Sequence, residues 1–220
     1  MFAIPDPVVL KIHQYYFLES LLRDFPSMLK DWQSKEIHLI RKDAQVASEG
    51  DDIIEESIYS QYSSCIYEQT DYEEHLFSQA IFMMVFSYYE SIVHKMAIDC
   101  GTQDRPSVIC QRHGKTLSME AVTASETIYR EARILRNYLC HNNAGTESES
   151  EAKETRMVLE KLEARGSINM EIVRGDDGQV LIGQSLFYNV NTHYTLEILK
   201  KEYLVLRELA VTCGYTNRLN

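Results

Sequence analysis

Apolar residues recur at steps of three and four along most of the chain, which predicts a largely helical protein. The first amphipathic segment covers residues 12–32 and contains Pro26. A proline ring clashes with the preceding helical turn, so this segment is expected to form either two helices or one bent helix. Residues 36–70 have a mixed pattern, with a loop expected at residues 48–52 and a weaker helix or extended segment after it.

The most apolar stretch covers residues 75–97, and from Leu76 to Phe86 its apolar residues surround the helix axis. A helix that is apolar on all sides is usually buried in the middle of a bundle. Gly101 follows as the expected left-handed cap. Glu90 and His94 are polar exceptions four residues apart, hence on one helix face. They belong either to a site or to the end of the helix that emerges into solvent.

A further helix is expected to begin at Thr123-Ala124-Ser125-Glu126, which has the spacing of a capping box. Its apolar stripe would hold Ile128, Ala132, Leu135 and Leu139. Many of the other residues of this helix are polar, which is unusual for a helix with an apolar stripe. Polar groups that are buried need hydrogen-bond partners. The segment is therefore either a satisfied polar network or a functional site. The candidate site residues in the sequence RILRNYLCHNN are Arg136, Asn137 and His141.

The C-terminal third predicts a helix at residues 151–165, stopped by Gly166, and a last helix at residues 191–211. Between them, alternating apolar residues at 168–172 and 180–182 flank Gly175-Asp176-Asp177-Gly178, which is typical of a β-hairpin. Residues 101–116 are expected to form a loop with a small basic cluster. The fold class predicted is all-α, a helical bundle with a small β-hairpin before the last helix.

Composition narrows the function classes. A formal net charge of −11 argues against general coating of nucleic acid, but not against a local basic site. The five cysteines are odd in number and no two have C-x-x-C spacing, which favours a reduced, cytoplasmic location. We find no signal peptide, no apolar run of the roughly 18 residues that a membrane span needs, and no motif for a metal or cofactor.

The chemistry of the polar segment suits RNA cleavage by attack of a 2′-hydroxyl on the adjacent phosphorus. Histidine transfers protons near neutral pH, and arginine presents a planar fork to phosphate oxygens. Arg136 and His141 are five residues apart, about 140° around an ideal helix. They meet one phosphate only if the helix end distorts or if both face a shared cleft. The reaction needs one group to remove a proton and one to donate a proton, and a single histidine supplies only one such group. A second copy of the histidine, from a dimer partner, would be useful.

Arg136-Asn137-Tyr138-Leu139-Cys140-His141 resembles the Arg-x4–6-His motif of the HEPN superfamily, in its Arg-Asn-x3-His form. An apolar helix that ends in an acidic residue, here Glu90, precedes the motif in that family. Some members have Glu-x3-Lys-Arg there, where this chain has His94 and Lys95. A hairpin followed by a terminal helix, as expected for residues 167–211, is similar to stand-alone abortive-infection-type members.

The resemblance covers residues 75–211, which would form the core; together with an N-terminal helical extension at 1–74, the chain is expected to form one domain over residues 1–220. The resemblance also implies a metal-independent endoribonuclease of prokaryotic defence or toxin–antitoxin systems, which acts as a homodimer on RNA and is controlled by an antitoxin or regulatory protein. Arg136 would stabilise the phosphate, His141 would transfer the proton, and Asn137 and Glu90 would position them. The alternative is a catalytically inactive module of the same fold, used for dimerisation or regulation.

Overall fold

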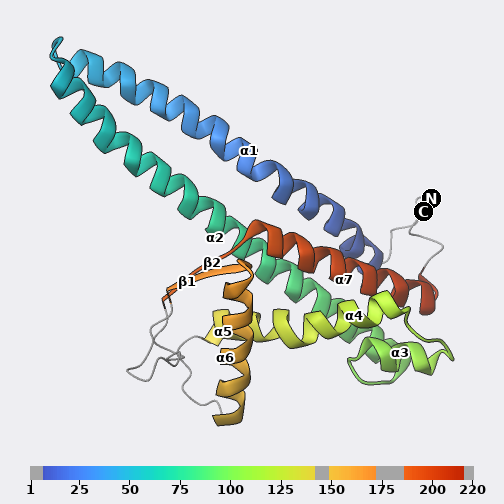
Figure 1. The fold of residues 1–220 in the computed structure, drawn as a ribbon. Coiled ribbons are helices and arrows are strands. Elements are labelled where there is room, and N and C mark those ends of the chain that lie inside the picture. The colour runs from blue at the N-terminus through green and yellow to red at the C-terminus, as the bar shows by residue number, and fades with distance from the viewer. Residues whose placement is uncertain (1–6, 142–148, 172–185, 216–220) are drawn as a thin grey trace, which may run out of the picture.

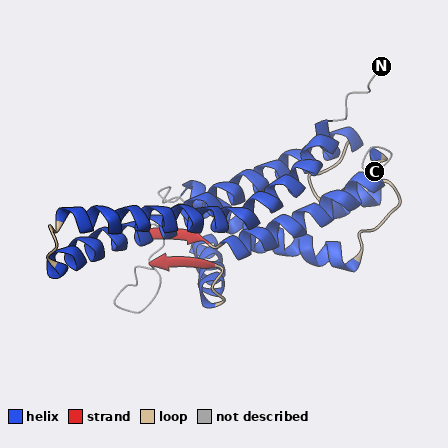
Figure 2. Cartoon of the chain, turned by 90° about the horizontal axis from the view of Figure 1, so that it is seen from above, coloured by secondary structure: helices blue, strands red, loops and turns tan. Residues whose placement is uncertain are grey.

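Helices make up most of the protein in the computed structural model, which describes residues 7–141, 149–171 and 186–215 (Figure 1). The all-α prediction is confirmed at this level. The longest elements are α1 (Pro7–Ala47) and α2 (Asp52–Cys100), which pack against each other as an antiparallel pair. Seen from above, the closed end of this pair projects well beyond the other elements (Figure 2).

Helix α1 continues through Pro26, so residues 12–32 lie in one helix and not in two. Residues 36–70, whose sequence pattern is mixed, are helical except for the turn at 48–51. Asp51 caps the start of α2, because its side chain accepts hydrogen bonds from the Ile53 and Ile54 backbone N–H groups at 2.9 and 3.1 Å. The boundary expected between residues 74 and 75 falls inside α2, so the extension and the core share a continuous helix.

The second half of α2 forms the centre of the core, as its all-round apolar pattern predicts. Its length and composition also satisfy the criteria for a membrane span, with a window of mean hydropathy 1.3, but 44% of that window is buried inside the protein. The core helix of a bundle passes the same criteria. The buried residues of this half include Ile81, Phe82, Val85, Phe86, Ile92, Val93 and Met96.

The helical run that carries the Arg–His motif begins earlier than predicted. It consists of α4 (Met119–Thr127), a π-helical turn (Ile128–Ala132) and α5 (Arg133–His141). Ser118 is the N-cap, since its side chain accepts from the Ala121 N–H at 3.1 Å. The expected start at Thr123 is wrong, because Ser118 also gains a tertiary partner: its backbone N–H donates to Glu208 at 2.9 Å.

Two further details of this region differ from the sequence pattern. Tyr138 is buried, whereas Leu139 is only half-buried. Both positions follow Leu135 by an allowed helical step, so periodicity alone does not choose between them. The expected loop at residues 101–116 contains a short helix, α3 (Pro106–Arg112), while Gly101 adopts the predicted left-handed conformation with φ of 61°.

The C-terminal elements are α6 (Glu149–Ala164), β1 (Ile168–Glu171), β2 (Leu186–Val190) and α7 (Thr192–Thr212). The predictions of both helices are confirmed. The strands pair antiparallel, with Ile168 opposite Val190. The predicted turn at residues 175–178 and its second arm at 180–182 lie outside the described residues; the strand found opposite β1 is later in the chain than that arm.

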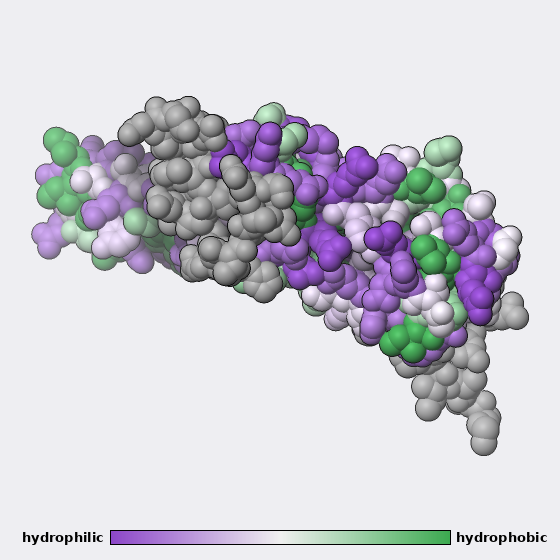
Figure 3. Space-filling view, turned by 90° about the horizontal axis from the view of Figure 1, so that it is seen from below, coloured by the Kyte–Doolittle hydropathy of each residue, from purple (hydrophilic) through white to green (hydrophobic). Residues whose placement is uncertain are grey.

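Charged side chains attach α6 to the motif-bearing helix. Glu131 is buried and receives hydrogen bonds from Lys161 at 2.6 Å and Arg165 at 2.8 Å. Burial alone would raise the pKa of Glu131, but the hydrogen bonds and positive charges of these two partners outweigh it and lower the pKa. Elsewhere the surface is mixed: seen from below, hydrophilic residues predominate and apolar ones form small separate groups (Figure 3).

A carboxyl group lies within the core itself. Glu202 of α7 is fully buried, and Tyr15 of α1 donates its hydroxyl proton to Glu202 Oε2 at 3.1 Å. Burial raises the pKa of Glu202 well above the usual value, and the negative charge of Glu90 raises it further, against the opposite effect of the Tyr15 hydrogen bond. Glu202 is therefore a neutral acid in the folded protein.

Glu202→Gln is expected to stabilise the protein at neutral pH. In the wild type, the unfolded chain ionises Glu202 above its ordinary pKa while the folded chain does not, so stability falls as pH rises. Glutamine keeps the acceptor for Tyr15 but does not ionise. Denaturant unfolding should give equal stabilities for variant and wild type near pH 4, and a gain on the order of 2 kcal/mol for the variant at pH 7.

Glu197→Gln is the matched control on the same helix, where the carboxylate forms an ion pair with Lys201 at 2.6 Å. It should cost about 0.5 kcal/mol at pH 7. A Glu202→Gln variant that is less stable than wild type at pH 7 would show that the buried carboxylate is ionised and required.

Candidate functional site

The structure brings together Glu90 and Arg136, two residues that sequence analysis selected from separate helices. Both carboxylate oxygens of Glu90 accept from Arg136 Nη2, at 2.7 and 2.6 Å. The guanidinium carbon also lies 5.2 Å from the centroid of the Phe86 ring. Arg136 thus crosses from α5 to the face of α2 on which Glu90 emerges from the core.

This ion pair is only partly sheltered. The side chain of Arg136 is 21% exposed and that of Glu90 is 44% exposed. Arg136 Nε is buried and has no hydrogen-bond partner among the described residues. A guanidinium has five N–H donors, and Glu90 engages those of one nitrogen. The pair therefore fixes the direction of Arg136 without using its full capacity to bind an anion.

The other two motif residues follow on the same helix. Asn137 is half-buried beside Arg136. His141 is the last residue of α5, and its side chain lies outside the described part of the protein. Because α5 is an α-helix from Arg133 to His141, positions 136 and 141 lie about 140° apart around its axis. The residues after His141, where the helix end would have to distort, lie outside the described part of the chain.

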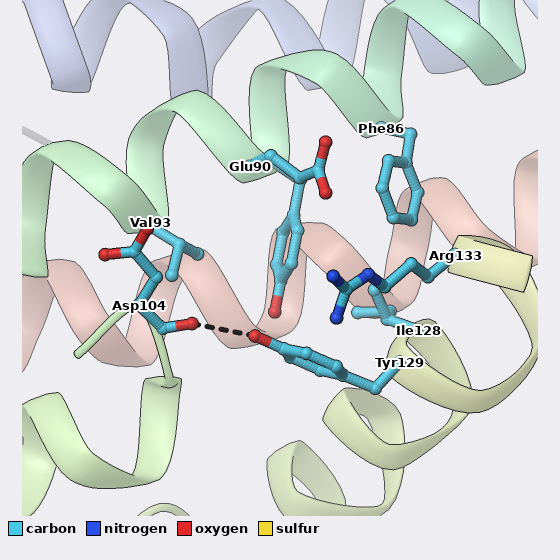
Figure 4. Close-up of a pocket in the computed structure, with 8 residues that line it drawn as sticks. Phe86, Glu90, Val93, Asp104, Ile128, Tyr129 and Arg133 are labelled. Carbon is cyan, nitrogen blue, oxygen red and sulfur yellow. Dashed lines mark hydrogen bonds between the residues drawn. The ribbon is translucent and has the colours of Figure 1, made fainter. Parts of the chain in front are cut away.

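A pocket of about 150 Å³ opens next to the ion pair, between α2, the loop before α3 and the motif-bearing helix. In Figure 4, Arg133 and Tyr129 reach toward this space from one side and Glu90 from the other. Burial raises the pKa of Tyr89, so its hydroxyl is uncharged at the pocket wall. The residues that line the pocket are Phe86, Tyr89, Glu90, Val93, Asp104, Ile128, Tyr129 and Arg133.

Asp104 organises one edge of the pocket. Its backbone carbonyl accepts from the Tyr129 hydroxyl at 2.7 Å, and its carboxylate lies 2.6 Å from His94 Nδ1. His94, whose role the sequence left open, is thus paired with a loop residue at an exposed position. Ile128 and Tyr129 belong to the π-helical turn, and such turns occur frequently at functional sites.

The pocket combines a cation with aromatic walls. The guanidinium carbon of Arg133 lies 5.6 Å from the Tyr129 ring centroid, and Arg136 is held next to Phe86. Two guanidinium groups near flat aromatic surfaces suit a planar or anionic group such as a nucleotide base or phosphate. The carboxylates of Glu90 and Asp104 offset the positive charge of the two arginines. The net charge around the pocket is therefore close to zero, although the protein as a whole is acidic.

The positions of Asp104, Tyr129 and Arg133 at this pocket were not predicted from the sequence. Asp104 lies in a loop without a recognisable motif, and it meets Tyr129 through a contact 25 residues apart. The only feature of the sequence that could have indicated this pocket is the series of arginines in the motif-bearing segment. Comparisons of the chain with protein-family models, curated proteins and solved structures found no match.

A double-mutant cycle on Glu90→Ala and Arg136→Ala is expected to give a coupling energy of about 1 kcal/mol for folding at low ionic strength. The two short contacts favour coupling, and exposure of the carboxylate limits it. The coupling should decrease in 1 M salt, because exposed charges are screened.

The pair Glu19 and Arg23 on α1 is the control, with an Nη2–Oε1 distance of 2.7 Å in a helical i,i+4 arrangement. Its coupling should be smaller, about 0.3 kcal/mol. Equal coupling of the two pairs would mean that the contact between α2 and α5 adds no specific stability.

Proposed function

We propose that the protein is a metal-independent endoribonuclease of the HEPN type, which acts as a homodimer in prokaryotic defence or in a toxin–antitoxin system. The observation that carries the proposal is the contact between Glu90 and Arg136. It joins the acidic residue of the apolar helix to the arginine of the Arg-x4–6-His motif, next to a pocket with aromatic walls.

In this proposal, Arg136 stabilises the charge that develops on the phosphate during attack by the 2′-hydroxyl. Glu90 orients the guanidinium and Asn137 supports the same group or the phosphate. His141 transfers the proton, either from the 2′-hydroxyl or to the 5′-leaving oxygen. The RNA then ends in a 2′,3′-cyclic phosphate on one fragment and a 5′-hydroxyl on the other. None of these steps requires a metal ion.

The helical geometry supports a composite site formed by two copies of the chain. Positions 136 and 141 lie about 140° apart around the axis of α5, so residues at these positions of one chain are not on one helix face. A second copy across a dimer cleft would supply the complementary group. It would also provide a second histidine, so that one serves as the general base and the other as the general acid.

One observation favours the inactive regulatory module as a second candidate. Glu90 neutralises much of the charge of Arg136, as expected of a purely structural contact between two helices. The two candidates differ in whether the motif residues are needed for a reaction or only for stability.

The first test is incubation of the purified chain with tRNA and mRNA in buffer without Mg²⁺ and in EDTA. Wild-type protein is expected to cleave RNA, and His141→Ala and Arg136→Ala should each lower the rate on the order of 100-fold or more. The termini should be 2′,3′-cyclic phosphate and 5′-hydroxyl. Circular dichroism of each sample establishes that the helices persist under the assay conditions.

His38→Ala and Arg23→Ala on α1 are the matched controls, since both residues are exposed and distant in sequence from the motif. They should leave cleavage unchanged. Folded wild-type protein that leaves RNA intact, or motif variants that cleave as fast as wild type, would contradict the proposal and favour the regulatory module.

A second test addresses the composite site. Arg136→Ala and His141→Ala chains, each inactive alone, are unfolded together, refolded as a mixture and assayed. If Arg136 of one chain works with His141 of the other, mixed dimers retain one intact Arg136–His141 pair and should cleave faster than either variant alone, though more slowly than wild type because only one histidine remains. If both groups act within one chain, mixing recovers nothing.

A further inference from the structure

Three side chains with metal-binding atoms converge at the end of the molecule where α2, α3 and α7 finish. Cys100 is the last residue of α2, His113 caps the C-terminus of α3, and Cys213 caps the C-terminus of α7. The Cys100 thiol lies 3.1 Å from His113 Nε2 and 4.0 Å from the Cys213 thiol. All three ligand atoms lie within 4.8 Å of one another.

The two separations from Cys100 are close to the edges of a tetrahedral zinc site. Zinc binds thiolate sulfur at about 2.3 Å and imidazole nitrogen at about 2.0 Å. Across a tetrahedral angle, those bond lengths place two sulfurs about 3.8 Å apart and a sulfur and a nitrogen about 3.6 Å apart. The distances from Cys100 to its two neighbours differ from these values by about half an ångström or less. The third pair, His113 and Cys213, lies within 4.8 Å, so side-chain movements of about 1 Å would complete the site.

The electrostatic surroundings also favour a cation. The three helices present their C-terminal ends to the cluster, and each end carries a partial negative charge from carbonyl groups without helical partners. The cluster is accessible: His113 is exposed, and both cysteines are half-buried. Tyr215 donates its hydroxyl proton to Asp99 at 2.9 Å, which attaches the chain after α7 to the end of α2 next to Cys100.

A disulfide between Cys100 and Cys213 explains the arrangement less well. The sulfur–sulfur separation of 4.0 Å is about twice the length of a disulfide bond, and both cysteines are free. A disulfide also gives no role to His113, whose ring nitrogen faces the Cys100 thiol. A metal ion accounts for all three side chains.

We propose that Cys100, His113 and Cys213 bind one Zn²⁺ ion, with water in the fourth position. The ion would join three helix ends that are remote in the sequence. It would also fix the segment between Cys100 and His113, which supplies Asp104 to the pocket. Cys100 follows Glu90 by ten residues, about 15 Å along the axis of α2, so the ion is separate from the proposed catalytic groups.

The test is titration of the full-length, reduced protein with Co²⁺, which replaces zinc in thiolate sites and absorbs visible light. We expect saturation at one Co²⁺ per chain, intense bands typical of tetrahedral cobalt, a near-ultraviolet thiolate-to-cobalt band, and loss of all bands when Zn²⁺ is added. Zn²⁺ should also raise the Tm of the metal-free protein, because it binds the folded state.

His113→Gln should abolish these bands at the Co²⁺ concentration that saturates wild type, and the exposed position of His113 lets the substitution leave the packing of the core unchanged. Cys100→Ser together with Cys213→Ser should abolish them too. Cys65→Ser, at an exposed position of α2, is the control and should keep the wild-type spectrum. Circular dichroism establishes that each variant is folded.

Three results would overturn the proposal: reduced wild-type protein that gives no tetrahedral cobalt spectrum, His113→Gln that keeps the wild-type spectrum, or a Cys100–Cys213 disulfide as the stable form with no metal uptake after reduction. The readout is metal binding, so it does not depend on whether the protein cleaves RNA.

Discussion

Burial of the second half of α2 is the constraint on which the remaining structure depends. Its large apolar side chains lie against α1 and α7, and each contributes about 1.5–3 kcal/mol by leaving water. The rotation of α2 about its axis is therefore fixed. Tyr89 is directed inward, and Glu90, its neighbour, emerges toward α5. The direction of the proposed active-site carboxylate is thus a consequence of core packing.

The main helices could be predicted from the sequence because they depend on local patterns. The all-round apolar segment that contains Phe86, the left-handed Gly101 and the limits of α7 are each visible in a short window. The predictions that failed concern choices that tertiary partners decide. Ser118 begins α4 where a capping box had suggested Thr123, since Glu208 of α7 also binds Ser118.

In the candidate site, too, some features could be predicted from local sequence and others depend on tertiary contacts. Glu90 and Arg136 could be selected because they are polar residues in otherwise apolar helices, and such residues require partners. That they are partners of each other is a tertiary fact, as is the meeting of Asp104 with Tyr129. The cluster of Cys100, His113 and Cys213 had no local signal at all, because two of its members are 113 residues apart. Motif spacing identifies ligands only when one short segment supplies them.

The projecting end of the α1–α2 pair has a consequence for how this protein can be altered. The turn at residues 48–51 lies far from the other helices, and the side chains of Val46 and Ile53 beside it are 77% and 83% exposed. Matched segments removed from both arms would shorten the pair while the core half of α2 keeps its neighbours. The length of this arm can consequently be changed without altering the packing of the core, and its tip is a suitable place to insert a fluorescent reporter.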